Sequence, residues 1–124
     1  MGRLLVKPSV DFGLFLAPAG ARILDVLKRL VPSYSFDVTI TSARDSTHSG
    51  PSDPHHSGEA FDLRTHDLTD HQKALLLADL RETLYKTPRK FWIDLEAPGQ
   101  PHEHIHCQRR KGVTYTVDDY LQNR

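Results

Sequence analysis

The sequence predicts an α+β fold in which a small, mostly antiparallel sheet is flanked by helices. Strand-like and helix-like segments alternate along the chain. The last two expected strands, residues 90–95 and 102–108, are separated only by a turn around Pro98-Gly99. So short a connection joins antiparallel strands, because a parallel crossover needs a dozen or more residues. At 124 residues, the chain has room for one compact domain spanning 1–124.

In the first third of the chain, hydrophobic periodicity predicts one helix and one strand. Residues 1–19 are expected to be extended and interrupted by prolines. A helix is predicted over 21–31 and should stop at Pro32. Residues 36–40 alternate apolar and polar side chains and predict a strand. The helical spacing is carried by Ile23, Val26, Leu27 and Leu30.

The middle of the chain combines a long loop with a strand and a helix. Residues 43–57 have no period and are rich in loop-forming residues, which predicts a long functional loop. A strand is expected over 58–63. Thr69 to Gln72 form a capping box that opens a helix ending before Pro88. Its expected apolar stripe is Ala74, Leu77, Leu80 and Leu84. A short helix is expected near the C-terminus, over 117–121.

Composition excludes several classes of protein. Lys+Arg and Asp+Glu number 16 each, so the chain lacks the positive charge on which nucleic-acid binding depends. No apolar stretch is long enough to span a bilayer. Lys7, Pro8 and Asp11 interrupt the N-terminal apolar stretch, so we expect no signal peptide and synthesis in a cytoplasm. The single cysteine, Cys107, excludes an intramolecular disulfide and is expected in the core.

Histidine is the outlier of the composition. Of the 8 histidines, most fall in two clusters, the string His55-x-x-Gly58-x-Ala60-x-Asp62 and the run from His102 to His106. Two imidazoles and one carboxylate at separated positions match a catalytic zinc site, which has three protein ligands and an open fourth position. The pattern therefore predicts a metal centre built from both clusters.

Strand alternation indicates which side chains share a face. Gly58, Ala60 and Asp62 fall on one face of the expected strand, and the two small residues leave space beside Asp62. His55 then comes from the preceding loop, whereas His56 is expected to be exposed. In the second cluster, His102, His104 and His106 point one way, and Ile105 and Cys107 point into the core.

Together the two motifs resemble the zinc-peptidase fold of D-Ala-D-Ala metallopeptidases and phage endolysin peptidases. The amino-terminal domain of hedgehog signalling proteins is similar, most of all at His104-Ile105-His106-Cys107. The resemblance runs from about Val38 to Gln108, and Thr41-Ser42-Ala43-Arg44 fits a family segment in which a strand ends in Ser and Arg. It implies three zinc ligands: His55, Asp62 and His106.

The resemblance also implies catalytic and substrate-binding roles. Glu103, three positions before the last ligand, would be the general base. Arg44 would steady the substrate carbonyl or carboxylate, and Ser42 and Asp53 would line the substrate site. If 102–106 is one regular strand, however, Glu103 faces away from His106. Either that strand begins irregularly after Pro101, or His104 takes more of the catalytic role.

The expected function is therefore a zinc peptidase acting on peptidoglycan stem or cross-bridge peptides, as a D,D-carboxypeptidase or an endopeptidase. It is expected to be a monomer without nucleic-acid or membrane partners. A phage or prophage enzyme of this kind would act at the cell wall after release or as part of a virion. The alternative is a non-catalytic zinc-binding module, structural or partner-binding, on the same fold.

Overall fold

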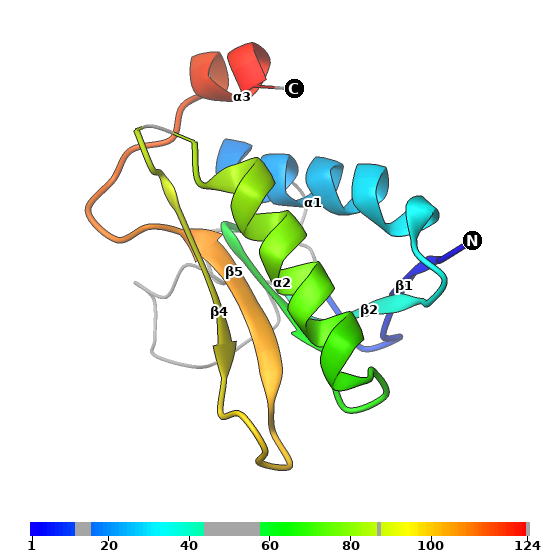
Figure 1. The fold of residues 1–124 in the computed structure, drawn as a ribbon. Coiled ribbons are helices and arrows are strands. Elements are labelled where there is room, and N and C mark those ends of the chain that lie inside the picture. The colour runs from blue at the N-terminus through cyan, green and yellow to red at the C-terminus, as the bar shows by residue number, and fades with distance from the viewer. Residues whose placement is uncertain (12–15, 44–57, 87, 124) are drawn as a thin grey trace.

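A computed structural model describes residues 1–11, 16–43, 58–86 and 88–123. Its helices and strands confirm the expected α+β class, and the strands form one mixed sheet (Figure 1). In chain order they are β1 (Leu4–Val6), α1 (Pro18–Leu30), the short 3₁₀ helix η1 (Val31–Ser33), β2 (Val38–Ser42), β3 (Ala60–Arg64), α2 (Asp70–Leu84), β4 (Phe91–Glu96), β5 (His104–Arg109) and α3 (Val117–Asn123).

The sheet brings the two predicted motifs together at its centre. Its strand order is β1-β2-β3-β5-β4, with β1 parallel to β2 and the other neighbours antiparallel. Strands β4 and β5 form the hairpin predicted from the short connection at Pro98-Gly99. In the β3–β5 pair, Asp62 lies opposite His106. Residues 44 positions apart in sequence therefore become direct cross-strand neighbours.

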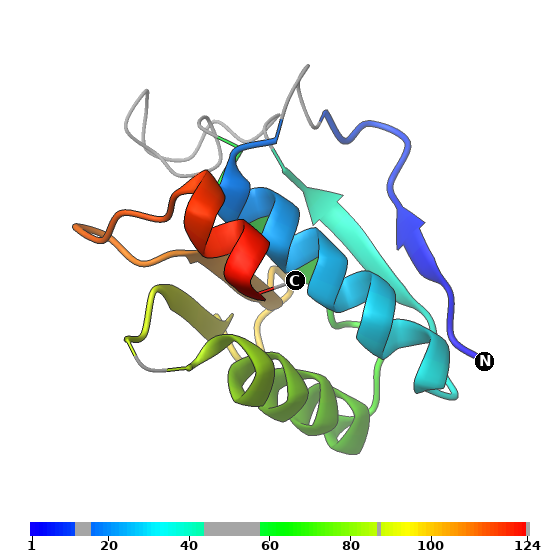
Figure 2. The ribbon, with the colours of Figure 1, turned by 90° about the horizontal axis from the view of Figure 1, so that it is seen from above.

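Helices α1 and α2 cover one face of the sheet (Figures 1 and 2). That face carries the core, in which Phe61, Leu63, Ile93 and Ile105 are fully buried. Cys107 is also fully buried there as a free thiol, as predicted. The alternating residues of β3, β5 and β4 project from the opposite face, on which none of the described helices packs. The histidine-bearing side of the sheet is therefore the side away from the helices.

Helix α1 begins three residues earlier than predicted. The expectation that residues 1–19 are extended is wrong at its end, because α1 starts at Pro18. Proline suits the first turn of a helix, where its missing N–H would have no partner and its fixed φ is already helical. Within the described residues, no helix is both long enough and apolar enough to cross a membrane.

The capping box of α2 is confirmed in both directions. Gln72 donates its backbone N–H to Thr69 Oγ1 at 3.1 Å, and Thr69 donates its own to Gln72 Oε1 at 3.0 Å. The predicted apolar stripe is half right. The fully or nearly buried residues are Leu76, Leu80 and Leu84, whereas Ala74 is exposed. Because the predicted helical period started at Ala74 rather than at Leu76, the expected apolar stripe was rotated about the helix axis relative to the buried one.

Two glycines fix how α1 meets the beginning of β3. Gly58 has φ +73°, a backbone conformation that glycine adopts without a steric cost. A Cβ placed on Gly20 would lie 1.9 Å from the Gly58 carbonyl oxygen. The strand predicted over 58–63 begins only at Ala60, and Gly58 lies in the turn before it, so this glycine serves backbone geometry and close helix packing rather than a face of the strand.

Candidate metal centre

Three potential metal ligands meet on the face of the sheet away from the helices. Asp62 comes from β3, and His104 and His106 come from β5. One ligand atom from each lies within 4.8 Å of the other two. Asp62 Oδ1 is 2.7 Å from His106 Nδ1 and 3.6 Å from His104 Nε2. Asp62 and His106 are only 5% and 9% exposed, so the group is largely removed from water. These three side chains could hold a metal ion.

The backbone fixes the tautomer of His104. Its Nδ1 lies 2.8 Å from the carbonyl oxygen of His102, which can only accept a hydrogen bond. Nδ1 therefore carries a proton, and in the neutral ring Nε2 keeps its lone pair. That lone pair points toward Asp62 Oδ1 and Glu96 Oε1, at 3.6 and 3.2 Å. Metal-binding histidines are commonly oriented in this way, through a hydrogen bond from the ring nitrogen that does not bind the metal.

His106 is oriented by Gln108 in a similar way. Gln108 Nε2 donates to the Arg109 carbonyl oxygen at 2.9 Å, which turns Gln108 Oε1 toward His106 Nε2 at 2.7 Å. His106 Nε2 therefore donates a proton, and Nδ1 faces the Asp62 carboxylate. Burial acts to lower the pKa of His106, but the hydrogen bond and charge of Asp62, with Gln108 and Glu96, raise it above its usual value.

Both histidines thus turn a lone-pair nitrogen toward carboxylate oxygens. Two acceptors facing each other in a poorly hydrated site repel unless a cation lies between them. A proton on each ring would satisfy the contacts at the cost of two neighbouring positive charges. One divalent metal ion would satisfy them together, with nitrogen and oxygen donors that suit zinc. The donor set therefore fits a metal ion on chemical grounds.

Glu96 is a site residue that sequence reasoning missed. It lies opposite His104 on β4, and its Oε1 is 3.2 Å from His104 Nε2 and 3.9 Å from His106 Nδ1. Its side chain is 38% exposed, so it is the acid of the group most open to solvent. The hairpin contained the signal: Trp92, Asp94 and Glu96 alternate with core residues and so share the face of the histidines.

Trp92 also belongs to this face. Its ring lies edge-on to that of His106, with centroids 6.4 Å apart, and its side chain remains 39% exposed. A half-exposed tryptophan beside a polar cluster offers an apolar surface against which a peptide substrate can rest.

The structure does not bring Glu103 to the metal centre. Its carboxylate lies on the helix side of the sheet, where Oε1 is 2.8 Å from Lys73 Nζ and accepts from Thr65 Oγ1 at 2.6 Å. Its Oε2 accepts from the backbone N–H of Gly99 at 2.9 Å. The Gly99 N–H, Lys73 and Thr65 lower the Glu103 pKa to about 2. The side chain is only 8% exposed and holds α2 against the hairpin, so its observed role is structural.

The strand predicted over 102–108 begins only at His104, because residues 101–102 form a turn and the Glu103 N–H donates to the Gln100 carbonyl oxygen at 3.0 Å. Glu103 thus stands just before β5, and its side chain still points to the helix side of the sheet. It lines a hollow of about 410 Å³ whose walls include Leu77, Leu95 and Pro98, on the opposite side of the sheet from the cluster. The strand does begin irregularly after Pro101, but this start does not turn Glu103 toward the cluster, whereas His104 lies in it.

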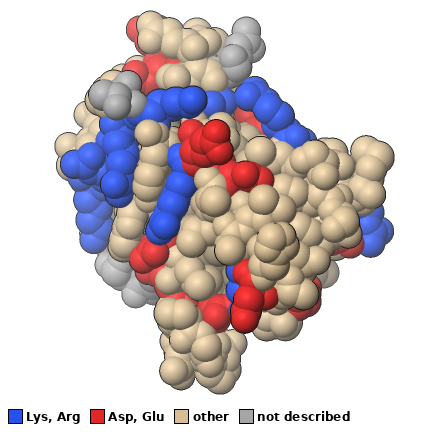
Figure 3. Space-filling view, viewed as in Figure 1, with Lys and Arg blue, Asp and Glu red and all other residues tan. Residues whose placement is uncertain are grey.

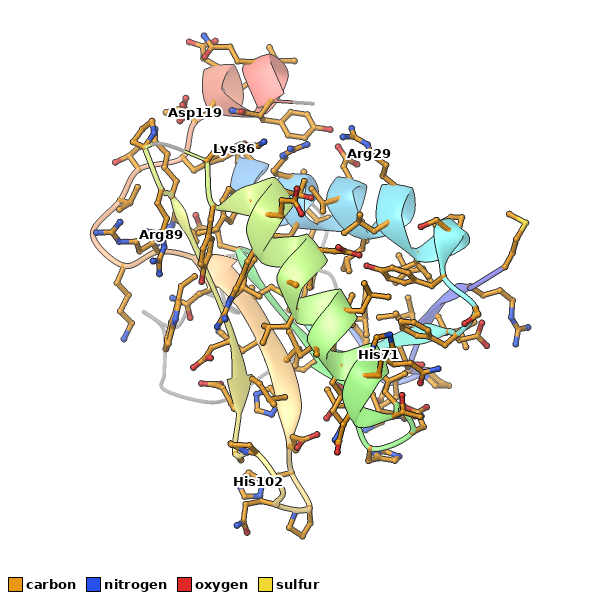
Figure 4. All side chains as sticks on the ribbon, in the orientation of Figure 1. Arg29, His71, Lys86, Arg89, His102 and Asp119 are labelled. Atoms are coloured by element: carbon orange, nitrogen blue, oxygen red, sulfur yellow. The ribbon has the colours of Figure 1, made fainter. Side chains whose placement is uncertain are left out.

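The remaining predicted residues fall into two groups. Ser42 is the register partner of Asp62 in the β2–β3 pair, so its backbone lies next to that of Asp62, and its substrate-binding role stays a prediction. Arg44, Asp53 and His55 lie outside the described residues. His102 is exposed at the tip of the β4–β5 hairpin (Figure 4), and its carbonyl oxygen orients His104.

Comparison with known proteins returns no relative. No protein-family model, curated protein or solved structure matches this chain significantly.

Proposed function

We propose that the chain is a zinc-dependent peptidase that cleaves peptide bonds of bacterial peptidoglycan. The proposal rests mainly on the buried meeting of Asp62, His104 and His106, whose nitrogen lone pairs face carboxylate oxygens. The motif resemblance around Gly58-x-Ala60-x-Asp62 and His104-Ile105-His106 supplies the substrate class. Stem or cross-bridge peptides would be cut by D,D-carboxypeptidase or endopeptidase action.

In this proposal, zinc is held by Asp62 and His106 together with His104, His55 or both. When bound, zinc polarises a carbonyl group and lowers the pKa of water toward neutrality. Asp62 supplies the negative charge that balances part of the ion's charge. Gln108 and the His102 carbonyl fix the two imidazole rings, and such outer contacts commonly change metal affinity 10–100-fold, as an order of magnitude.

The proton-transfer role moves from Glu103 to Glu96. Glu103 is occupied by Lys73 and Thr65 on the helix side. Glu96 lies beside His104, and its side chain is partly open to solvent. Its Oε1 would accept the proton of the attacking water and return it to the leaving amine.

Substrate would lie along the exposed face of the hairpin. Trp92 offers an apolar contact on one side of the cluster. Ser42, next to Asp62 on the other side, offers a hydroxyl to the peptide backbone. Arg44, which follows two residues later, is proposed to bind the substrate carbonyl or carboxylate. The protein would act at the cell wall, after release from the cell or carried in a virion.

Hydrolysis of purified peptidoglycan tests the proposal. The zinc-loaded protein is expected to release peptide fragments whose masses identify the bond that is cut, and Asp62→Asn is expected to release none. Absence of fragments with zinc bound at one ion per chain would refute the peptidase proposal.

One observation favours a second candidate, a non-catalytic zinc-binding module. The inclusion of His104 gives four potential ligands when His55 is counted, and a closed set of four protein ligands is typical of structural zinc. X-ray absorption spectroscopy separates the two functions. A catalytic centre is expected to show a water oxygen among the zinc ligands, whereas a structural one is expected to show only protein donors and no change on addition of peptide.

A further inference from the structure

A second feature of the molecule is a buried arginine, Arg22, with one guanidinium nitrogen that no described residue hydrogen-bonds. Arg22 projects from α1 and is 6% exposed. Its Nη1 atom has no hydrogen-bond partner among the described residues. Burial is the largest influence on its guanidinium and lowers its pKa from the usual value, which means that nearby acids do not offset the lost hydration. A buried cation in this state is costly to the fold unless something supplies negative charge.

Arg22 faces a hollow of about 190 Å³. The hollow lies where α1, the end of α2, the start of β4 and α3 come together, on the helix side of the sheet and thus away from the metal centre (Figure 1). Tyr115 lines it too, and its buried hydroxyl makes no well-formed hydrogen bond in the described part of the chain. The Asn123 amide lies near this hydroxyl but donates to the Asp119 carbonyl oxygen at 2.6 Å. A buried guanidinium nitrogen and a buried hydroxyl, neither well bonded by the described residues, therefore border one small space.

The charges around the hollow are mostly positive. Besides Arg22, its walls include Lys86, Lys90 and a single acid, Asp119. Asp119 is already engaged by Lys90 Nζ at 3.1 Å and by the Thr116 backbone N–H at 2.8 Å. Lys86 and Asp119 lie at the α3 end of the molecule (Figure 4), where Lys and Arg side chains gather on the surface (Figure 3). The net charge of these four groups is positive by two, which suits a dianion better than a single carboxylate.

We propose that this hollow binds phosphate, either as the inorganic ion or as the phosphate group of a small phosphorylated molecule. The planar guanidinium of Arg22 matches two oxygens of a phosphate, and the Tyr115 hydroxyl can donate to a third. The exposed Lys86 would contribute charge at the rim. The space is smaller than the roughly 300 Å³ of the smallest drug-sized pockets, so the ligand is a small one. This site is separate from the proposed peptidase centre and does not depend on it.

Calorimetric titration and thermal unfolding of the full-length chain test the proposal. The probes are inorganic phosphate, glycerol phosphate and, as a monoanion, acetate, each added at equal ionic strength in a chloride buffer. The variants are Arg22→Gln, Tyr115→Phe and the matched control Arg29→Gln, which changes an exposed arginine on the same helix (Figure 4). Stronger binding of glycerol phosphate than of phosphate would identify a phosphate monoester as the ligand.

Phosphate is expected to bind saturably and raise the melting temperature, whereas acetate is not. Arg22→Gln should weaken phosphate binding at least about tenfold, since it removes a charge-assisted hydrogen bond. Its melting temperature in chloride should not fall much, because it also removes an uncompensated buried charge. Tyr115→Phe should weaken binding by a smaller factor, and Arg29→Gln should not weaken it. Absence of saturable binding, equal binding by Arg22→Gln, or a preference for acetate would overturn the proposal.

Discussion

His106 Nδ1 and Asp62 Oδ1 lie 2.7 Å apart across the two central strands of the sheet, in a setting almost closed to solvent. The other ring nitrogen of His106 already donates to Gln108. A separation of 2.7 Å is that of a hydrogen bond, so the two atoms share a proton, and a metal ion bound by both side chains would take the place of that proton. The proposed metal centre is therefore built on the contact between these two residues.

Asp62→Asn should abolish specific zinc binding. The substitution removes the only charged oxygen of the three-ligand cluster, and we expect zinc affinity to fall by more than about 100-fold. Asp94→Asn is the matched control, because Asp94 also lies opposite His106 but binds Arg81 at the sheet edge. Competition with a chromophoric chelator measures both affinities. Equal loss in the two variants would show that general charge, rather than the cluster, binds the metal.

Zinc should stabilise the folded protein. A ligand that binds only the folded state at a hundred times its Kd adds about 2.7 kcal/mol to the free energy of unfolding. Denaturant unfolding with added zinc or chelator measures this difference. The stabilisation should be missing in His106→Ala. If that variant gains as much from zinc as the wild type, the metal binds elsewhere.

Glu96→Gln should lower turnover without displacing zinc. Loss of a general base typically costs about 10²–10⁴ in rate, and Glu96 is not among the three mutually close ligands. Glu103→Gln serves as the comparison and should keep its activity below its melting temperature, because its carboxylate lies on the other side of the sheet. Steady-state hydrolysis by both variants decides the assignment. The reverse result would return the base to Glu103.

Acid should destabilise the protein partly through Glu103. The pKa of its carboxyl is lowered from 4.5 in the unfolded chain to about 2 in the folded protein, foremost by the Gly99 N–H and then by Lys73 and Thr65. A depressed pKa contributes stability above pH 4.5 that is lost as the pH falls toward 2. Denaturant unfolding between those pH values should show a shallower loss in Glu103→Gln than in the wild type. Identical slopes would mean that this ion pair does not contribute.

Gly20→Ala should destabilise the fold although it improves helix propensity. Replacing glycine in a helix ordinarily gains up to about 1 kcal/mol. Here the new Cβ would lie 1.9 Å from the Gly58 carbonyl oxygen, so backbone must move. Overpacking of this kind costs about 1–3 kcal/mol, and we expect it to outweigh the gain. A rise in the denaturation midpoint would contradict the close packing of α1 against the start of β3.

Much of the fold could be predicted because it depends on local pattern. The capping box at Thr69 set the start of α2, and the short connection at Pro98-Gly99 set the β4–β5 hairpin. The start of α1 could not be set, since Pro18 reads equally well as the end of an extended segment or as the first residue of a helix.

The part of the site that could be predicted is the part that depends on side-chain alternation within a single strand. Alternation placed His104 and His106 on one face, and the motif identified Asp62. Glu103 was assigned to catalysis by family pattern, against the alternation of the strand predicted over 102–108. Its engagement by Lys73 depends on how α2 packs, which no local pattern reveals. Glu96 depends on the register of the hairpin, and that register follows from the turn geometry.

The most direct test is a zinc titration of chelator-stripped protein in which bound metal and peptidoglycan hydrolysis are measured on the same samples. We predict that hydrolysis rises in proportion to zinc occupancy and saturates at one ion per chain, and that Asp62→Asn neither binds nor hydrolyses. Full occupancy without hydrolysis, or hydrolysis that survives removal of the metal, would contradict the assignment of a zinc peptidase.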